Sequence, residues 1–113
     1  MKTKKQLVKI NNFLIFLTIN FFIVTLGLLG ATLNAYAIMN NDCKMPVYFS
    51  EYQFVSNRHF SYTDFNQVNS PILTDIIKIP LNYDHYISIG DVLIYISFPL
   101  VIINFIVYLF RKK

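Results

Sequence analysis

The stretch FLIFLTINFFIVTLGLLGATL, residues 13–33, runs for 21 residues without a charged side chain. A helix of that length is about 31 Å long, which matches the roughly 30 Å hydrocarbon core of a bilayer. A second apolar run, VLIYISFPLVIINFIVYLF, covers residues 92–110 and predicts a helix of about 28 Å. The two runs therefore predict two transmembrane helices.

The rest of the 113-residue chain is short, and the composition agrees with a membrane protein. Charged residues make up 14% of the chain, against roughly 25% in soluble domains. The predicted fold is an α-helical membrane protein in which two transmembrane helices form a hairpin around a small extracytoplasmic cap, either α+β or irregular. Its expected divisions are a basic N-terminus (1–12), helix 1 (13–33), the insert (34–87), helix 2 (88–110) and a basic C-terminus (111–113).

The charges are divided between the ends and the middle of the chain. Basic residues without acids precede the first run and follow the second, and all six acidic residues lie between the runs. This distribution follows the positive-inside rule, so we expect both termini in the cytoplasm and the insert outside. A nucleic-acid partner is not predicted, because the basic residues flank apolar spans. Ile, Asn, Lys, Phe and Tyr make up about half of the chain, which is typical of an AT-rich genome and favours a bacterial cell membrane.

A cleaved signal peptide is the alternative for the first run. Ala35, Tyr36 and Ala37 form an A-x-A sequence after it, so residues 1–37 are either retained or removed. The length of the run favours retention, since the apolar region of signal peptides usually covers 7–15 residues. Both alternatives leave the insert outside.

Polar and small residues inside the spans indicate helix contacts. Asn20 and Asn104 lie at nearly the same expected depth in an antiparallel hairpin, so we predict a hydrogen bond between their amides. Gly27 and Ala31 form a small-xxx-small pair that allows close approach of a helix. The alternative partner for these residues is a second copy or another membrane protein.

The insert holds nine aromatic residues between positions 38 and 86, which predicts a partly ordered cap with rings at the membrane interface. Residues 45–55 read as an extended segment. Ser70 and Pro71 predict the start of a short helix that ends at Pro80 and lies either on the bilayer or on the cap. Ser88 with Asp91 predicts a capping box at the start of helix 2.

Chemistry-bearing residues are sparse. His59 and His85 are far apart in sequence, and Cys43 has no partner arranged as in a known thiol site. We therefore expect no catalytic site, no metal, no cofactor and no enzymatic activity.

Four short elements occur in the order Met45-Pro46-Val47, His59, Asp75 with Pro80, and Ser88-Ile89-Gly90-Asp91 running into Val92-Leu93. Together they resemble a family of uncharacterised bacterial membrane proteins, a domain of unknown function, over residues 41–98. The resemblance implies a membrane location. It also implies one cluster on the outer face, which consists of Pro46, His59, Asp75, Gly90 and Asp91.

The expected function is that of a small, non-enzymatic integral membrane protein. Besides the lipid bilayer, its partner would be another membrane protein, for which it is an accessory subunit, or a second copy. A bacteriocin immunity protein is one alternative, because short two-span proteins with basic ends are common among them. A holin-like pore-former is the other, although it calls for a polar helix face.

Overall fold

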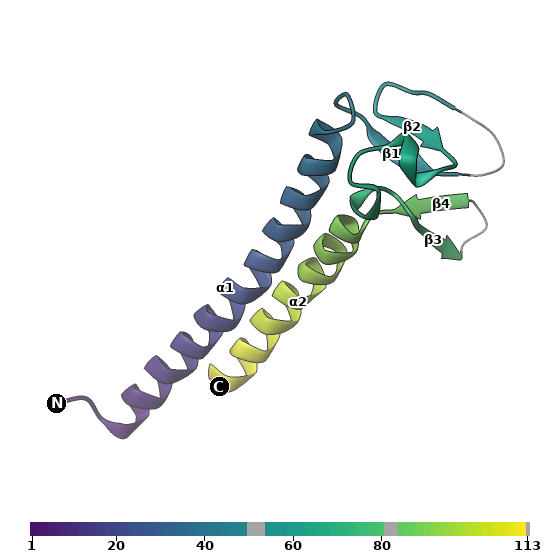
Figure 1. Ribbon diagram of the computed structural model, residues 1–113. Helices are drawn as coiled ribbons and strands as arrows, with labels where there is room; N and C mark the ends of the chain where they lie inside the picture. The colour runs from purple at the N-terminus through teal and green to yellow at the C-terminus, as the bar shows by residue number, and fades with distance from the viewer. Residues whose placement is uncertain (50–53, 81–83, 113) are drawn as a thin grey trace.

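The computed structural model describes residues 1–49, 54–80 and 84–112 and consists of two long antiparallel helices with a small cap at one end (Figure 1). Helix α1 spans Lys4–Met39 and helix α2 spans Ile89–Lys112. The molecule measures 68 × 30 × 20 Å, and both helices are long and apolar enough to cross a membrane. The two predicted helices and the small strand-containing region between them are confirmed.

Both helices begin at capping boxes. At the start of α1, Gln6 N donates to Thr3 Oγ1 at 3.2 Å and Thr3 N donates to Gln6 Oε1 at 2.9 Å. At the start of α2, Asp91 N donates to Ser88 Oγ at 3.0 Å and Ser88 N donates to Asp91 Oδ2 at 3.3 Å. The second box confirms the prediction for Ser88 and Asp91. The first box places the start of α1 at Lys4, so that most of the basic segment before the apolar run is helical. Thr3 stabilises this start because its side chain accepts from a free N–H group of the first turn.

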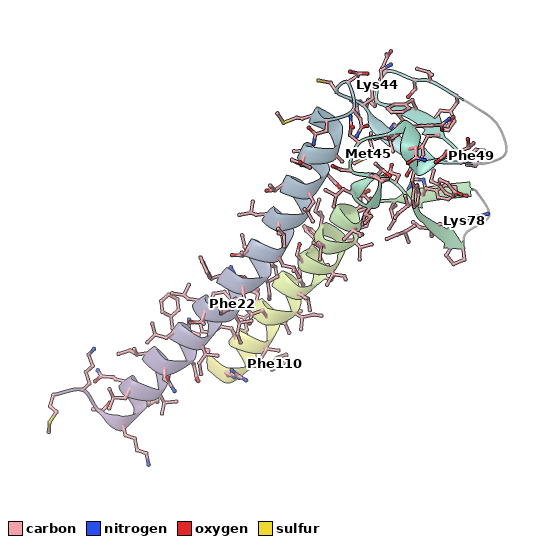
Figure 2. All side chains as sticks on the ribbon, viewed as in Figure 1. Phe22, Lys44, Met45, Phe49, Lys78 and Phe110 are labelled. Carbon is pink, nitrogen blue, oxygen red and sulfur yellow. The ribbon has the colours of Figure 1, made fainter. Side chains whose placement is uncertain are left out.

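The helices pack along a seam with a seven-residue period, and large apolar side chains cover their outer faces (Figure 2). Alternating steps of three and four residues keep one face of each helix toward its partner, as in left-handed helix pairs. On α1 the seam consists of Phe16, Asn20, Ile23, Gly27, Gly30, Asn34 and Ala37. On α2 it consists of Gly90, Ile94, Ser97, Val101, Asn104 and Tyr108.

Glycines bring the helices closest near the cap. A β-carbon on Gly30 would collide with Gly90 O and would lie 2.9 Å from Leu93 Cβ, and one on Gly27 would lie 2.6 Å from Ser97 Oγ. Gly27 is therefore in the contact, as predicted. Ala31 is exposed on the outer face of α1, so the small pair that faces α2 is Gly27 with Gly30. The pair of Gly27 and Ala31 is therefore not the one that faces α2, because a step of four from Gly27 leaves the seam, whereas a step of three stays on it; its contact with a second copy or another membrane protein stays a prediction.

Asn104 forms a hydrogen bond across the hairpin, but with a different partner from the one predicted. Its Nδ2 donates to Phe16 O at 3.2 Å, while Asn20 makes no side-chain hydrogen bond with any residue that the structure describes. Phe16 lies one helical turn before Asn20, so the expected depth is right and the predicted amide–amide bond is wrong. The backbone carbonyl is available because a carbonyl oxygen has two lone pairs, of which the helix uses one.

We expect Asn104→Leu to lower the stability of the hairpin by about 0.6–1.7 kcal/mol, from the average to the largest value found for hydrogen bonds between membrane helices. Asn20→Leu is the matched control and should change stability by less, since it removes no hydrogen bond. The measurement is the midpoint of an SDS titration of the protein in nonionic detergent. Equal losses in the two variants would contradict this assignment.

The cap consists of two small sheets. Strand β1 (Met45–Tyr48) pairs in parallel with β2 (His59–Tyr62), and β3 (Ile77–Pro80) pairs antiparallel with β4 (Asp84–Ile87). Two 3-10 turns, η1 (Phe65–Gln67) and η2 (Pro71–Leu73), connect them. The buried centre of the cap includes Met45 and Phe49, which Figure 2 shows within it. The predicted extended segment is confirmed at β1, and its residues 50–53 lie outside the described part of the chain.

The predicted helix between Ser70 and Pro80 is wrong beyond its first turn. Only η2 is helical, and Ser70 has a φ of 50° and no side-chain capping bond. The chain then leaves the helical path, because Asp75 N donates to Pro46 O at 3.0 Å and Tyr48 N donates to Asp75 O at 2.9 Å. Asp75 thus lies beside β1, and the β-branched residues that follow it continue as β3, in line with their preference for strands.

Candidate functional site

A cavity of about 260 Å³ lies in the cap. Its walls come from both sheets and from the segments next to them, so that residues far apart in the sequence share it. It is lined by Val47, Phe49, Phe54, Ser56, His59, Asp75, His85 and Tyr86.

Asp75 is the buried ionisable group of this cavity, with 6% of its surface exposed. Its backbone is fixed by hydrogen bonds to β1, which hold the carboxyl group in place. Oδ2 lies 3.9 Å from His59 Nε2, which is too long for a hydrogen bond, and Oδ1 has no hydrogen-bond partner among the described residues. Burial, and after it the negative charge of Asp91, raises the pKa of Asp75 from 3.8 to about 7.

Aromatic rings form the apolar wall of the cavity. Phe49 lies between two other rings, with its centroid 5.8 Å from that of Tyr86 and 6.3 Å from that of Phe54. The interplanar angles are 84° and 71°, so that each neighbour stands nearly perpendicular to Phe49. Such edge-to-face packing is the arrangement that aromatic quadrupoles favour.

The five residues expected on the outer face fall into two groups. Pro46, His59 and Asp75 lie together, with the His59 ring and the Asp75 carboxyl group both at the cavity. Gly90 and Asp91 lie at the start of α2 against α1. Asp91 is nevertheless close enough to Asp75 for its charge to raise the pKa of that residue.

Asp91 belongs to a polar cluster with Asn34 and Ser88 at the cap end of the hairpin. Asn34 Nδ2 donates to Asp91 Oδ1 at 2.7 Å, and Ser88 Oγ donates to Asn34 Oδ1 at 2.5 Å. Because Ser88 and Asp91 also bond each other in the capping box, all three side chains are satisfied within the cluster. The cluster therefore joins α1 to α2.

Sequence reasoning missed Asn34 and Ser97, as well as the aromatic wall of the cavity. A signal for the first two was present, since Asn20, Gly27 and Asn34 on one helix and Gly90, Ser97 and Asn104 on the other recur every seven residues. Each set is one polar or small line in an apolar span. For the cavity wall no local signal existed, because it unites residues from separate strands.

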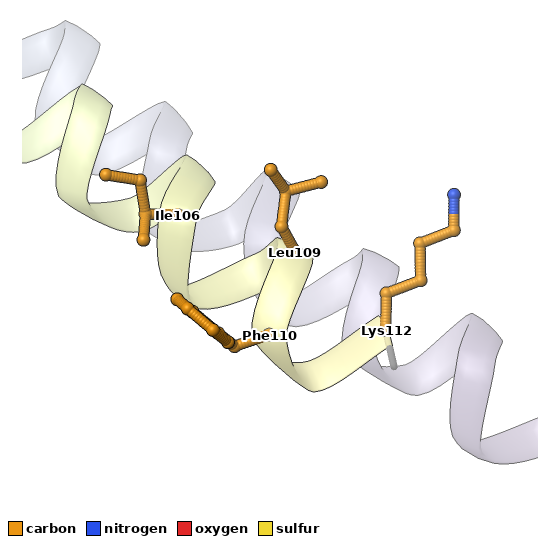
Figure 3. A pocket seen from close by; sticks show the side chains of 4 residues that line it. All are labelled: Ile106, Leu109, Phe110 and Lys112. Carbon is orange, nitrogen blue, oxygen red and sulfur yellow. The ribbon is translucent and has the colours of Figure 1, made fainter.

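A larger cavity, of about 450 Å³, is a groove on the outer surface of α2 near its C-terminal end (Figure 3). It is lined by Ile106, Leu109, Phe110 and Lys112. Lys112 is the one charged side chain among these four, and the others are apolar. The mostly apolar groove thus suits a lipid chain.

Within residues 1–49, 54–80 and 84–112, no three His, Cys, Asp or Glu side chains come together as ligands for a metal ion. The cap cavity supplies a carboxyl group, imidazole and aromatic rings instead, a set suited to binding a small ligand.

These features define a class, a small helical hairpin able to span a membrane that carries a strand-containing cap with a polar cavity. Residues 5–103 match the family of unknown function DUF5317, and the chain belongs to that family. The match confirms the resemblance to an uncharacterised domain family. Comparisons with curated proteins and with solved structures give no match.

Proposed function

We propose that the chain is a non-enzymatic protein of a bacterial cell membrane that acts by binding a membrane partner, either another membrane protein or a second copy. In this proposal both helices cross the bilayer, both termini are cytoplasmic and the cap lies outside. The basic residues at both ends and the acidic residues in the cap support that orientation. Residues 1–37 are retained, which agrees with the complete burial of Ala37 in the middle of a helical turn.

The observation that carries partner binding is the outer face of α1. Thr18, Thr25 and Thr32 are exposed there, and each hydroxyl donates to the carbonyl four residues earlier, at 2.7–2.8 Å. These bonds hide the polarity of the hydroxyls from lipid. Exposed Ala31 and Ala35 lie on the same helix. The three threonines recur every seven residues, as positions in the seam with α2 do, so they offer a further helix a continuous row of small side chains.

The pore-forming alternative receives less support from the same helices. Asn34 and Asn104 each form a hydrogen bond with the opposite helix, Asn34 with Asp91 and Asn104 with the carbonyl of Phe16. A water-filled pore built from several hairpins calls for a polar face on the outside of each hairpin. In this hairpin, large apolar side chains such as Phe22 and Phe110 are exposed on the outside.

Native mass spectrometry of the protein, tagged after Lys113 and extracted gently from its own membrane, tests the proposal. We expect a complex with at least one further polypeptide, either another protein or a second copy of this chain, and Thr25→Phe should reduce the abundance of that complex at least tenfold by blocking the face of α1. Ile103→Phe is the matched control, because Ile103 is 54% exposed on α2, and it should leave the complex unchanged. A lone wild-type monomer would overturn the proposal and would make protection of a sensitive strain from a bacteriocin the next assay.

A further inference from the structure

The cavity in the cap contains a charge that the fold leaves uncompensated. The Asp75 side chain is 8% exposed, its buried Oδ1 has no hydrogen-bond donor among the described residues, and the residue is one of those that line the cavity. A buried ionised carboxylate is strongly unfavourable unless a positive group or several donors face it. A positive group closer to the carboxylate than the His59 imidazole, which lies 3.9 Å from Oδ2, would stabilise the ionised form.

The surroundings indicate which kind of cation fits. His59 Nε2 lies 3.9 Å from Asp75 Oδ2, and the same cavity is lined by the aromatic residues Phe49, Phe54 and Tyr86. The faces of aromatic rings attract cations, and sites for substituted ammonium ions combine such rings with a carboxylate. A metal ion would need further oxygen or nitrogen ligands, which the described residues do not bring together.

We propose that the cap cavity binds a small organic ammonium ion, with the Asp75 carboxylate as its counter-ion and the rings of Phe49, Phe54 and Tyr86 around its alkyl groups. The volume of about 260 Å³ is below the roughly 300–1,000 Å³ of pockets for drug-sized ligands, so the ligand is compact. An ammonium group of this kind is carried both by free amines and by lipid headgroups. The inference is independent of whether the hairpin binds a partner.

Choline and its uncharged isostere 3,3-dimethyl-1-butanol form the decisive pair of probes, because they differ in a nitrogen cation and a carbon atom. Saturation-transfer NMR of the methyl signals measures the binding of each to the full-length protein in nonionic detergent at pH 8. We expect choline to bind at least tenfold more tightly than the isostere. Equal affinity of the two probes, absence of choline binding, or displacement of choline by micromolar zinc would each overturn the proposal.

Variants locate the site. Asp75→Asn keeps the shape of the side chain and removes its charge, so choline affinity should fall at least tenfold. Asp42→Asn, an exposed position outside the cavity, is the matched control and should bind like the wild type. Phe54→Leu should weaken the binding of choline and leave the binding of the isostere nearly unchanged. Unchanged choline binding in Asp75→Asn would overturn the proposal, and circular dichroism of the same samples shows that each variant is folded.

The pH dependence gives an independent readout. Groups near the carboxyl group include His59 and His85 at the cavity, Tyr48 and Tyr62 on the two strands of the first sheet, and Asp91 at the start of α2. Because Asp75 has a pKa of about 7, it is mostly ionised at pH 8 and mostly protonated at pH 6. Choline should bind about tenfold more weakly at pH 6 than at pH 8. A pH-independent affinity would contradict a role for Asp75.

Nanodiscs distinguish the two sources of the ammonium group. In discs of phosphatidylglycerol alone, choline should bind as it does in detergent. In discs that contain phosphatidylethanolamine, a headgroup ligand would compete and lower the apparent affinity of choline, whereas a site for free amines would be unaffected.

Discussion

Replacing Gly30 with leucine is expected to separate the two helices and to lower the free energy of unfolding by at least about 3 kcal/mol, at or above the upper end of the usual range for overpacking. Gly30 faces Gly90 across the hairpin, and even a β-carbon on Gly30 would collide with a backbone oxygen there. A backbone atom does not move aside as the end of a flexible side chain does. The helices must therefore shift apart, which also breaks the contacts of Asn34 with Ser88 and Asp91.

Ala31→Leu is the matched control for this prediction. Ala31 neighbours Gly30 in sequence but is exposed on the outer face of α1, so the same added atoms meet lipid or detergent there. Stability is measured as the midpoint of an SDS titration. Cross-linking of Phe16→Cys with Tyr108→Cys, in a Cys43→Ser background, reports whether the helices remain adjacent, because the two wild-type rings stack at 4.6 Å. Retained cross-linking and an unchanged midpoint in Gly30→Leu would disprove the close contact.

The helices could be predicted from the sequence because length and lack of charge decide them locally. Their mutual orientation could not be predicted in the same way. In a soluble helix, apolar residues mark the buried face, but both faces of a membrane helix are apolar. The seam of this hairpin is marked by the small and polar residues that interrupt the apolar sequence. They are Gly30 and Asn34 on α1 and Gly90, Ser97 and Asn104 on α2. A seven-residue period in small and polar residues carries that information, and it places Ala31 outside.

The cap was harder to predict because its contacts are distant in sequence. Ser70 and Pro71 carry a valid helix-start signal, yet Asp75 exchanges backbone hydrogen bonds with β1, some thirty residues earlier in the chain. Tertiary pairing thus overrides a local preference worth a few tenths of a kcal/mol per residue. The same pairing buries Asp75 and creates the cavity, so the site could not be foreseen without the sheet. His59 and Asp75 were selected from the sequence, but Phe49, Phe54 and Tyr86 were not.

Asp75→Asn is expected to make the cap more stable above neutral pH, by up to about 4 kcal/mol at pH 8. Folding raises the pKa of this carboxyl group from 3.8 to about 7, so the folded state holds the proton more tightly than the unfolded state does. Its contribution to stability is therefore fully present below about pH 4, is lost as the pH rises toward 7, and stays absent above that. Each pKa unit corresponds to about 1.4 kcal/mol, and the asparagine variant removes this dependence.

Urea unfolding followed by near-UV circular dichroism of the cap tyrosines, in nonionic detergent between pH 4 and pH 8, measures the difference. The wild type and Asp75→Asn should be equally stable at pH 4 and should diverge as the pH rises, whereas Asp42→Asn should follow the wild type throughout. A wild type that is the more stable protein at pH 8 would show that the buried carboxylate is compensated within the fold. In that case the cavity would have no uncompensated charge for a ligand.

Asp75→Asn is expected to raise the stability of the fold and to lower its affinity for choline. These opposite effects distinguish a binding role of Asp75 from a structural one. If a carboxylate stabilises the fold, its neutralisation destabilises the protein, because its hydrogen-bond donors are left without an acceptor. A carboxylate that serves a ligand destabilises the empty protein, and its neutralisation stabilises the fold while it abolishes binding, a trade-off typical of functional sites. Saturating choline should accordingly stabilise the wild type at pH 8, by RT ln(1 + [L]/Kd), and leave Asp75→Asn unchanged.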